Sequence, residues 1–485
     1  FIYEFIYFLQ NFKKNKYRSM KTKKEQVLII GAGLCGSLLA LRLGQRGYDV
    51  TLVEKRPDLR MVGQDAGRSI NLSLSDRGVK AMKMVGLQDE IEKLCIPMIG
   101  RMIHDISGHK FMSLYSGKED KYINSISRPG LNMLLLDSAE KLPNVELHFN
   151  KSCEFLDFKN TMAVFEDYDT KEKITYNADL IFGTDGAGSV VRNNMFVNKD
   201  LRLSFSIDWL SHSYKELTIP ATENGDFRSE QNALHIWPRG ENMLISLPNL
   251  DGSFTVTLFL AHETGKDNFE NLNTPEKVSN YFEREYPDAK ALMPNLTEEF
   301  FENPTGRLGT VKCHPWNTYG KTLLIGDSAH AIVPFYGQGM NASFEDVVVL
   351  DKYIEKYEGD WGKTFSEFQK ERKVDADAIA DLAIDNFYEM KEHTANPLFQ
   401  KKRKLEVAFE DHYPGKYNSK YSLVTFNADI PYSEAMKRGR AQDKAILKLL
   451  DGGKLIDSVS LEEKLSLVLN ETKNILQDDD AAKKL

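Results

Sequence analysis

A glycine-rich turn, GAGLCG, lies at residues 31–36, after the β-branched run at 27–30 and before a run of helix-forming residues. In this strand–turn–helix context the spacing predicts a site for the pyrophosphate of a dinucleotide. Gly31 permits the tight turn, Gly33 lets the pyrophosphate approach the backbone, and Gly36 lets the helix pack on the strand. The helix N-terminus would stabilise the phosphate charge. A turn that binds no ligand is the alternative, which the context disfavours.

A carboxylate follows the second predicted strand, where a dinucleotide presents a ribose. Glu54 comes after the run at residues 50–53 and about 20 residues downstream of Gly33, the usual place for an acidic residue that binds ribose hydroxyls. FAD and NAD both carry such a ribose, so Glu54 does not distinguish between them.

A second glycine-containing turn, LLIGDSAH at residues 323–330, leaves another buried apolar run. Asp327 stands beside Gly326, so its carboxylate can bind a polyol chain while the backbone comes close. FAD has a ribityl chain to be held, and an NAD site needs no second element of this kind. The two turns together therefore favour FAD as the tightly bound cofactor.

The segment PFYGQGMNA at residues 334–342 runs into a predicted helix at 341–357. Its two glycines allow the backbone to lie against a flat ring. The helix N-terminus would stabilise the negative charge of a reduced flavin. An ordinary loop before a helix explains this segment equally well.

Together with DLIFGTDGAGS at residues 179–189, these motifs resemble the p-hydroxybenzoate hydroxylase-type family of FAD-dependent aromatic hydroxylases. The resemblance implies that the Asp185-Gly186 motif serves both FAD and a transiently bound nicotinamide donor, since the sequence has no second G-x-G-x-x-G motif. It also implies that Arg128, which precedes a predicted helix, contacts the flavin. Without the resemblance, Arg128 would be taken for a surface residue.

Within that group, longer segments resemble the kynurenine 3-monooxygenase family over roughly residues 25–440. They are GRSINLSLS at 67–75, PM at 97–98, RMIH at 101–104, ELTIP at 216–220 and LHIWPR at 234–239. The resemblance implies four substrate contacts: Arg101, Tyr115, Asn386 and Tyr421. An arginine can grip a carboxylate bidentately, and tyrosine and asparagine can complete its hydrogen bonds. The set therefore suits an α-amino acid that bears an aromatic ketone.

The resemblance implies non-covalent FAD and a transient NADPH, with O₂ hydroxylating L-kynurenine to 3-hydroxy-L-kynurenine, a step of tryptophan degradation and of quinolinate and NAD biosynthesis. The cofactor contacts that we expect are Gly31, Gly33, Cys35, Gly36, Val53, Glu54, Lys55, Arg56, Ser73, Arg128, Cys153, Asp185, Asp327, Met340 and Asn341. Because oxygen is activated on the flavin, we expect no catalytic acid or base and no metal site. A related hydroxylase of a phenolic acid and a flavin-binding regulatory protein without turnover remain open alternatives.

The hydrophobic pattern predicts an α/β fold with an α+β substrate layer. A Rossmann-like FAD-binding domain with a parallel sheet is interleaved with an antiparallel substrate sheet and followed by a C-terminal helical region. The runs at 243–247 and 253–260, joined through NLDG, predict an antiparallel hairpin. We place the FAD-binding domain at 25–96, 121–195 and 306–380, the substrate sheet at 97–120 and 196–305, and the helical region at 381–485.

The charge balance argues against nucleic acid as the main partner, because the net charge is −8 and basic residues form only short clusters. We expect one such cluster, at residues 401–404, to be a solvated face. The four cysteines, Cys35, Cys95, Cys153 and Cys313, form no Cys-x-x-Cys pair. We therefore expect neither disulfides nor zinc, and a cytoplasmic location. A homodimer is included among the expected assemblies.

The chain opens with Phe1, and a short apolar run, interrupted by Glu4, precedes a basic stretch. We expect Met20 to be the natural start and residues 1–24 to be a flexible or non-native extension. A short membrane-touching helix is the alternative. Residues 461–485 contain no apolar run near twenty residues, so we expect no stable membrane anchor there.

Overall fold

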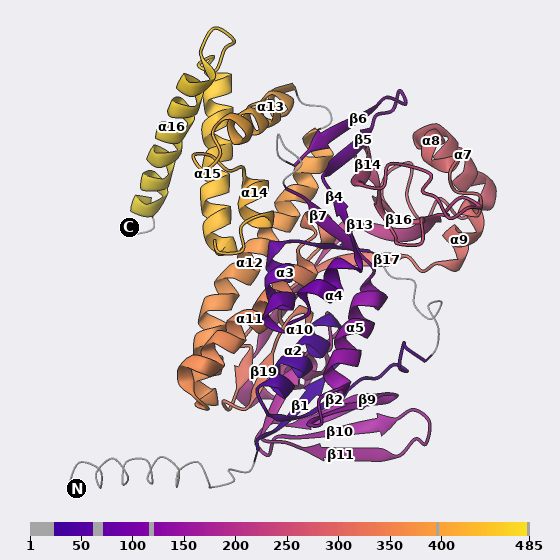
Figure 1. The fold of residues 1–485 in the computed structure, drawn as a ribbon, viewed down its shortest axis with the longest axis vertical. Coiled ribbons are helices and arrows are strands. Elements are labelled where there is room, and N and C mark those ends of the chain that lie inside the picture. Colours follow the sequence, from indigo (N-terminus) through magenta and orange to yellow (C-terminus); the bar gives the residue numbers. More distant parts are fainter. Residues whose placement is uncertain (1–23, 62–70, 116–120, 394–396, 483–485) are drawn as a thin grey trace, which may run out of the picture.

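The computed structural model describes residues 24–61, 71–115, 121–393 and 397–482. In Figure 1 a parallel sheet with its helices forms the lower part, an antiparallel sheet with three short helices lies at the upper right, and the C-terminal helices lie at the upper left. Met20 and nearly all of the predicted N-terminal extension fall outside the described residues.

The parallel sheet has β1 (Gln26–Ile30) near its centre, between β2 (Asp49–Val53) and β12 (Leu180–Gly183), and both pairings are parallel. Val27 to Ile30 are all buried, so both faces of this central strand are covered. The strand order is β18–β19–β12–β1–β2–β8, and its other members are β18 (Asn317–Thr318), β19 (Thr322–Leu324) and β8 (Val145–His148). The predicted parallel dinucleotide-type sheet is therefore confirmed.

The helices of the lower part pack on this sheet and on one another. The longer ones are α2 (Leu34–Gln45), α5 (Arg128–Glu140), α11 (Gly339–Tyr357) and α12 (Trp361–His393). The shorter ones are α3 (Asp76–Met84), α4 (Gln88–Glu92), α6 (Val190–Val197) and α10 (Asp327–His330). Since α11 contacts α2, α3 and α12, it joins early and late parts of the chain in one core.

The antiparallel sheet has seven strands in the order β17–β13–β16–β15–β14–β5–β6. They are β5 (Gly100–His104), β6 (Lys110–Leu114), β13 (Ser204–Ile219), β14 (Ala233–Arg239), β15 (Asn242–Pro248), β16 (Phe254–Ala261) and β17 (Gly306–His314). The predicted hairpin is confirmed as β15 and β16, and β14 pairs with β5 in parallel. Early and late segments of the chain therefore meet side by side in this sheet.

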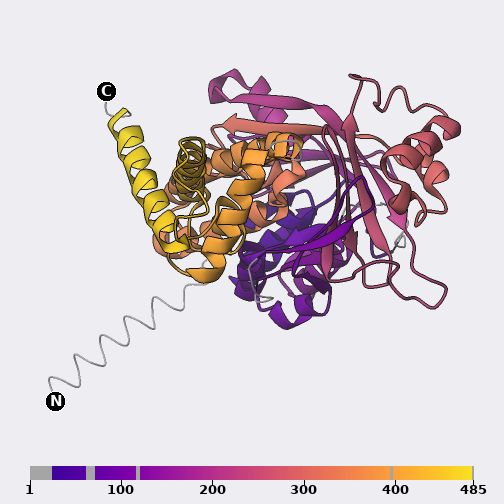
Figure 2. The same ribbon diagram turned by 90° about the horizontal axis from the view of Figure 1, so that it is seen from above.

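Both faces of the central strands β14, β15 and β16 are largely buried, and successive side chains alternate between them. Trp237, Leu244 and Leu258 pack on one face against α7 (Pro275–Glu285), α8 (Pro287–Lys290) and α9 (Leu296–Glu302). Ile236, Met243 and Phe259 lie in the core on the opposite face, together with residues of α12 and the C-terminal helices. Figure 2 shows the C-terminal helices and the three short helices on opposite sides of the sheet.

Two small sheets complete the fold. One has the order β3–β7–β4 and contains β3 (Leu72–Leu74), β4 (Cys95–Met98) and β7 (Ile123–Ile126). The other, which the sequence did not predict, contains β9 (Lys151–Asp157), β10 (Met162–Asp167) and β11 (Lys173–Asn177). Buried and partly buried residues alternate in β10, and exposed and partly buried residues alternate in β11, but charged residues interrupt the apolar pattern of both strands.

The C-terminal helices are α13 (Pro397–His412), α14 (Lys420–Thr425), α15 (Tyr432–Asp451) and α16 (Leu461–Ala482). The predicted solvated face at residues 401–404 is wrong for Lys402, which is buried. Its Nζ lies 2.7 Å from Asp443 Oδ1 on α15, because α13 and α15 pack together here. No helix within the described ranges combines the length and apolar character needed to cross a membrane.

A cluster of two histidines and a tryptophan binds α8 to the face of the antiparallel sheet that packs against α7, α8 and α9. His104 Nδ1 lies 2.9 Å from Asp288 Oδ2, and His104 Nε2 lies 2.9 Å from His235 Nδ1. Trp237 Nε1 also donates to Asp288, at 2.9 Å. Burial, above all, lowers the pKa of His235 to about 4. His235 therefore remains neutral at neutral pH.

We expect this cluster to make the fold sensitive to acid. Between pH 6.5 and about 4, this histidine binds a proton in the unfolded chain but stays neutral in the folded protein. The free energy of unfolding therefore falls as the pH drops. A shift of this size corresponds to ~3 kcal/mol. His235→Gln should flatten the dependence in urea unfolding curves recorded across this range, and the control, exposed His109→Gln, should retain it. An equally steep dependence in His235→Gln would contradict the assignment.

Candidate active site

A cavity of about 440 Å³ lies between the parallel sheet, the antiparallel sheet and the C-terminal helices. Residues that follow β1, β12 and β19 line it, including Gly33, Gly186 and Asp327. These are the carboxyl ends of parallel strands, where open α/β sheets bind ligands. The far wall comes from Ile236, Phe259 and other residues of the antiparallel sheet.

The first glycine turn combines one crowded position with one open position. A Cβ atom at Gly36 would lie 2.0 Å from the Gly31 carbonyl oxygen and 2.6 Å from Thr184 Oγ1. A Cβ atom at Gly33 would meet no described atom within 4 Å, and Gly33 lines the cavity. The turn therefore leaves room for a ligand at Gly33 alone.

The N-terminus of α2 also opens at this turn. Gly33 is its N-cap residue, and no side chain of the described residues caps the free N–H groups. Uncapped N–H groups and the helix dipole together favour an anion such as a phosphate. The N-terminus of α11, next to Gly337 and Met340, likewise has no side-chain cap from the described part of the chain.

Glu54 lies beside the glycine turn rather than in the cavity wall. Its Oε2 accepts a hydrogen bond from Ala32 N at 2.8 Å, and its Oε1 accepts one from Arg56 N at 3.0 Å. Val53 accepts a backbone hydrogen bond from Gly31 N at 2.8 Å. Lys55 and Arg56 are exposed. This segment therefore flanks the turn at the carboxyl end of β2.

Two further carboxylates stand near the cavity. Asp185 Oδ2 accepts hydrogen bonds from Val190 N at 2.6 Å and Val191 N at 3.1 Å, while its buried Oδ1 has no partner among the described residues. Burial raises the pKa of Asp185, and burial also raises that of Asp327, which Arg128 partly opposes. Hydroxyl donors from a ligand would satisfy such carboxylates.

Cys153 and Asn341 are predicted cofactor contacts that lie outside the cavity lining. Cys153 is buried on β9, and burial followed by the Asp185 charge raises the pKa of its thiol to about 12. Asn341 Nδ2 donates to Ser73 O at 2.8 Å and Gly337 O at 3.0 Å, which joins β3 to the glycine loop before α11. Neither side chain is part of the cavity wall.

The four predicted substrate contacts converge from four separate segments. The Arg101 guanidinium lies 4.5 Å from the centre of the Tyr421 ring and 5.6 Å from that of Tyr115. The two tyrosine rings stack at 5.6 Å, and Asn386 Nδ2 donates to Phe335 O at 2.6 Å. Arg101 Nε and the buried Tyr115 hydroxyl have no hydrogen-bond partner in the described segments. An anion that also accepts hydrogen bonds would satisfy both groups.

Of the predicted site residues, nine line the cavity directly. They are Gly33, Cys35, Ser73, Arg101, Arg128, Asp327, Met340, Asn386 and Tyr421. The others lie behind this wall or beside the glycine turn. The open Gly33 position, the uncapped helix N-termini and the unpartnered Asp185 oxygen fit a dinucleotide whose ribityl chain and phosphates are held by hydrogen bonds.

Comparisons with known proteins agree with this geometry. Residues 24–382 match the family described as FAD binding domain. The chain is 43% identical over 448 residues to kynurenine 3-monooxygenase of Myxococcus xanthus, covering 92% of this chain and 96% of the relative. It is 43% identical over 455 residues to kynurenine 3-monooxygenase of Dictyostelium discoideum, covering 91% and 96%.

The chain belongs to the kynurenine 3-monooxygenase family.

Solved structures with low sequence identity show the same fold. A tetrameric form of 2-methyl-3-hydroxypyridine-5-carboxylic acid oxygenase has a TM-score of 0.62 and 20% identity, covering 80% of this chain and 96% of that chain. Pseudomonas aeruginosa PqsL, solved in complex with 2-aminobenzoylacetate, has a TM-score of 0.61 and 17% identity, covering 77% and 98%.

In this member of the kynurenine 3-monooxygenase family, a buried network of charged residues supports the second glycine turn. The sequence analysis did not predict this network. Asp346, on α11, accepts hydrogen bonds from Gly326 N at 3.0 Å, His330 Nε2 at 2.5 Å and Arg372 Nε at 2.8 Å. Burial raises the pKa of Asp346, but His330 and Arg372 outweigh it and lower the pKa. The sequence signal that could have revealed the network is Asp346 itself, an acidic residue among the apolar residues of a predicted core helix.

The two glycines of the first turn should respond differently to the same added methyl group. Gly36→Ala should lower the free energy of unfolding of the FAD-free protein by about 1–3 kcal/mol, because its Cβ overlaps the Gly31 carbonyl. Gly33→Ala should leave that stability nearly unchanged but weaken FAD binding at least about ten-fold (~1.4 kcal/mol). Urea unfolding and titration of FAD fluorescence measure the two effects. Wild-type FAD affinity in Gly33→Ala would exclude a pyrophosphate at this turn.

Proposed function

We propose that the protein is a flavoprotein monooxygenase that converts L-kynurenine, NADPH, H⁺ and O₂ into 3-hydroxy-L-kynurenine, NADP⁺ and H₂O. The observation that carries this proposal is the position of Arg101, a cation beneath two tyrosine rings in the cavity that begins at the glycine turn. The names of the relatives support the same substrate.

The dinucleotide would extend from the first glycine turn toward the loop before α11. Gly33 and the α2 N-terminus would hold the pyrophosphate, Glu54 a ribose, and Asp327 the ribityl chain. The other predicted cofactor residues flank this path. When bound, FAD supplies the redox chemistry that connects NADPH, O₂ and the aromatic ring.

The substrate would lie between the flavin end of the cavity and the antiparallel sheet. Arg101 would bind the carboxylate, with hydrogen bonds from the Tyr115 and Tyr421 hydroxyls. Leu234, Ile236 and Ile245 offer an apolar wall to the aniline ring. An apolar wall also excludes water, and fixed contacts at the carboxylate end orient the ring for attack.

We also propose a cytoplasmic location, supported by the four cysteines, all of which are free thiols. The homodimer remains a prediction.

Product identification tests the proposed function. Purified protein supplied with FAD, NADPH, O₂ and L-kynurenine should form 3-hydroxy-L-kynurenine, which chromatography with mass spectrometry identifies. Parallel reactions contain p-hydroxybenzoate as a phenolic acid or no aromatic substrate. NADPH consumption that yields product from p-hydroxybenzoate alone, or no substrate-dependent NADPH consumption at all, would refute the kynurenine assignment.

Arg101→Ala should weaken kynurenine binding by about 30- to 1,000-fold, equivalent to about 2–4 kcal/mol, because a carboxylate would lose its buried cationic partner. Arg101→Lys should recover part of the loss, since lysine cannot make the forked contact. The measurement is a kynurenine titration followed by flavin absorbance, together with the NADPH reduction rate. FAD content should remain normal.

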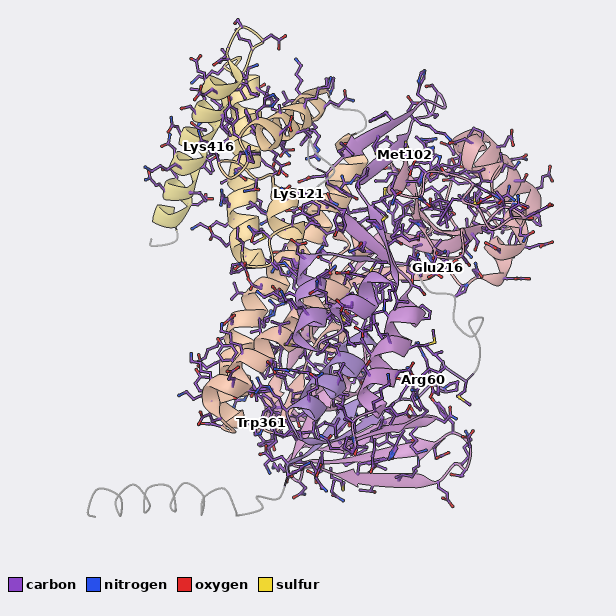
Figure 3. All side chains as sticks on the ribbon, in the orientation of Figure 1. Arg60, Met102, Lys121, Glu216, Trp361 and Lys416 are labelled. Carbon is purple, nitrogen blue, oxygen red and sulfur yellow. The ribbon has the colours of Figure 1, made fainter. Side chains whose placement is uncertain are left out.

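The matched control is Met102→Ala on the same strand. Met102, labelled in Figure 3, pairs with His235, so its side chain belongs to the opposite face of the sheet from that of Arg101. This variant should bind kynurenine with nearly wild-type affinity. Wild-type affinity in Arg101→Ala would remove Arg101 from the substrate site.

A further inference from the structure

Lys420 is a buried cation directly beside a cavity tyrosine. It is 7% exposed and is the first residue of α14, and Tyr421 follows it. Its Nζ lies 2.7 Å from Asp443 Oδ2 on α15 and forms a second ion pair with Glu389 on α12. Because a buried ammonium group is stable only when it is paired, these two carboxylates fix its position.

The Glu389 pair connects two segments that line the cavity. Glu389 lies three residues after Asn386 on α12, so both side chains share one face of that helix. Asn386 and Tyr421 both line the cavity. The Lys420–Glu389 ion pair therefore joins the helix that carries Asn386 to the helix that carries Tyr421.

A glycine on α15 makes room for this arrangement. A Cβ atom at Gly439 would lie 2.7 Å from Lys420 Cβ and 2.6 Å from Lys420 Cγ. Asp443 follows one helical turn later, where the lysine side chain ends. The stem of Lys420 thus lies directly on the α15 backbone, and its charge is bound at the next turn.

The helix that carries Tyr421 depends on such external contacts. α14 has six residues, too few for a helix to be stable by itself in water. Ser419, its N-cap, donates its backbone N–H to Glu410 Oε1 at 2.8 Å, and the Ser419 hydroxyl accepts from Ser422 N at 3.3 Å. Lys420 adds charged contacts to α12 and α15.

We propose that Lys420 is a positioning residue for the hydroxylation. Through Glu389 and Asp443 it sets the place of Tyr421 relative to Asn386, and so the orientation of the aromatic ring. This inference rests on the proposed function. Its consequence is that Lys420 controls how much of the NADPH consumed yields hydroxylated product, although it does not contact the substrate.

The test is the ratio of product formed to NADPH consumed in Lys420→Met. When the aromatic ring is not hydroxylated, the NADPH consumed yields hydrogen peroxide instead, by the balanced reaction NADPH + H⁺ + O₂ → NADP⁺ + H₂O₂. We expect this ratio to fall, peroxide to rise, and the rate of hydroxylation to fall about 10- to 100-fold, because ~1 Å of misplacement costs on the order of 100-fold in rate. The ratio does not depend on how much protein is folded.

Lys402→Met is the matched control. Lys402 is 5% exposed and pairs with the same Asp443, at 2.7 Å, but lies on α13, next to no residue of the predicted substrate set. Its loss should lower the melting temperature, as the loss of Lys420 does, and leave the product ratio at the wild-type value. Equal falls in both variants would show a general effect of destabilisation and overturn the inference.

Two further variants keep the inference testable if Lys420→Met fails to fold. Glu389→Gln removes the charge on the α12 side, and Gly439→Ala displaces the lysine without changing any charge. Both should lower the product ratio, and wild-type ratios in both would overturn the inference. Failure of the proposed function would instead appear in the wild-type protein, as an absence of 3-hydroxy-L-kynurenine.

Discussion

The Asp346 carboxylate occupies a fully buried position on α11, and the arrangement around the cavity depends on its pairing. A buried charge without partners would be strongly unfavourable. Its contacts to Gly326, His330 and Arg372 hold the turn after β19 against α11 and α12. Arg372 also pairs with Glu345, which binds Arg77 on α3. One chain of buried charges therefore ties four separate elements together.

This chain of charges reaches the C-terminal region through Arg77. Its guanidinium donates to the carbonyl oxygens of Asn427 and Ile430, in the turn between α14 and α15, and lies 3.9 Å from the centre of the Tyr432 ring. The same network thus supports the turn of Asp327 at one end and the segment after Tyr421 at the other. The cavity ends at Asp327 and at Tyr421 are consequently joined by one network of contacts.

The C-terminal helices contribute to the cavity as well as cover it. Lys402, which the sequence placed on a solvated face at residues 401–404, shares Asp443 with Lys420. Long lysine stems can pack against neighbouring helices while the charged ends are paired. Aromatic contacts add to these ion pairs. The Tyr421 ring stacks on the Tyr336 ring in the cavity wall, with 5.8 Å between the ring centres. Charge and ring contacts together hold α14 at the cavity.

The sequence alone determined the features that depend on neighbours along the chain. The turn at residues 31–36 and the hairpin of β15 and β16 follow from periodicity and glycine spacing, so both could be predicted. The family resemblance indicated Arg101 and Tyr421. Only the tertiary structure showed that their side chains meet at 4.5 Å, and that Asp346 and Lys420 are buried ions. Burial and ion pairing depend on which distant segments pack together, and local sequence does not encode that contact.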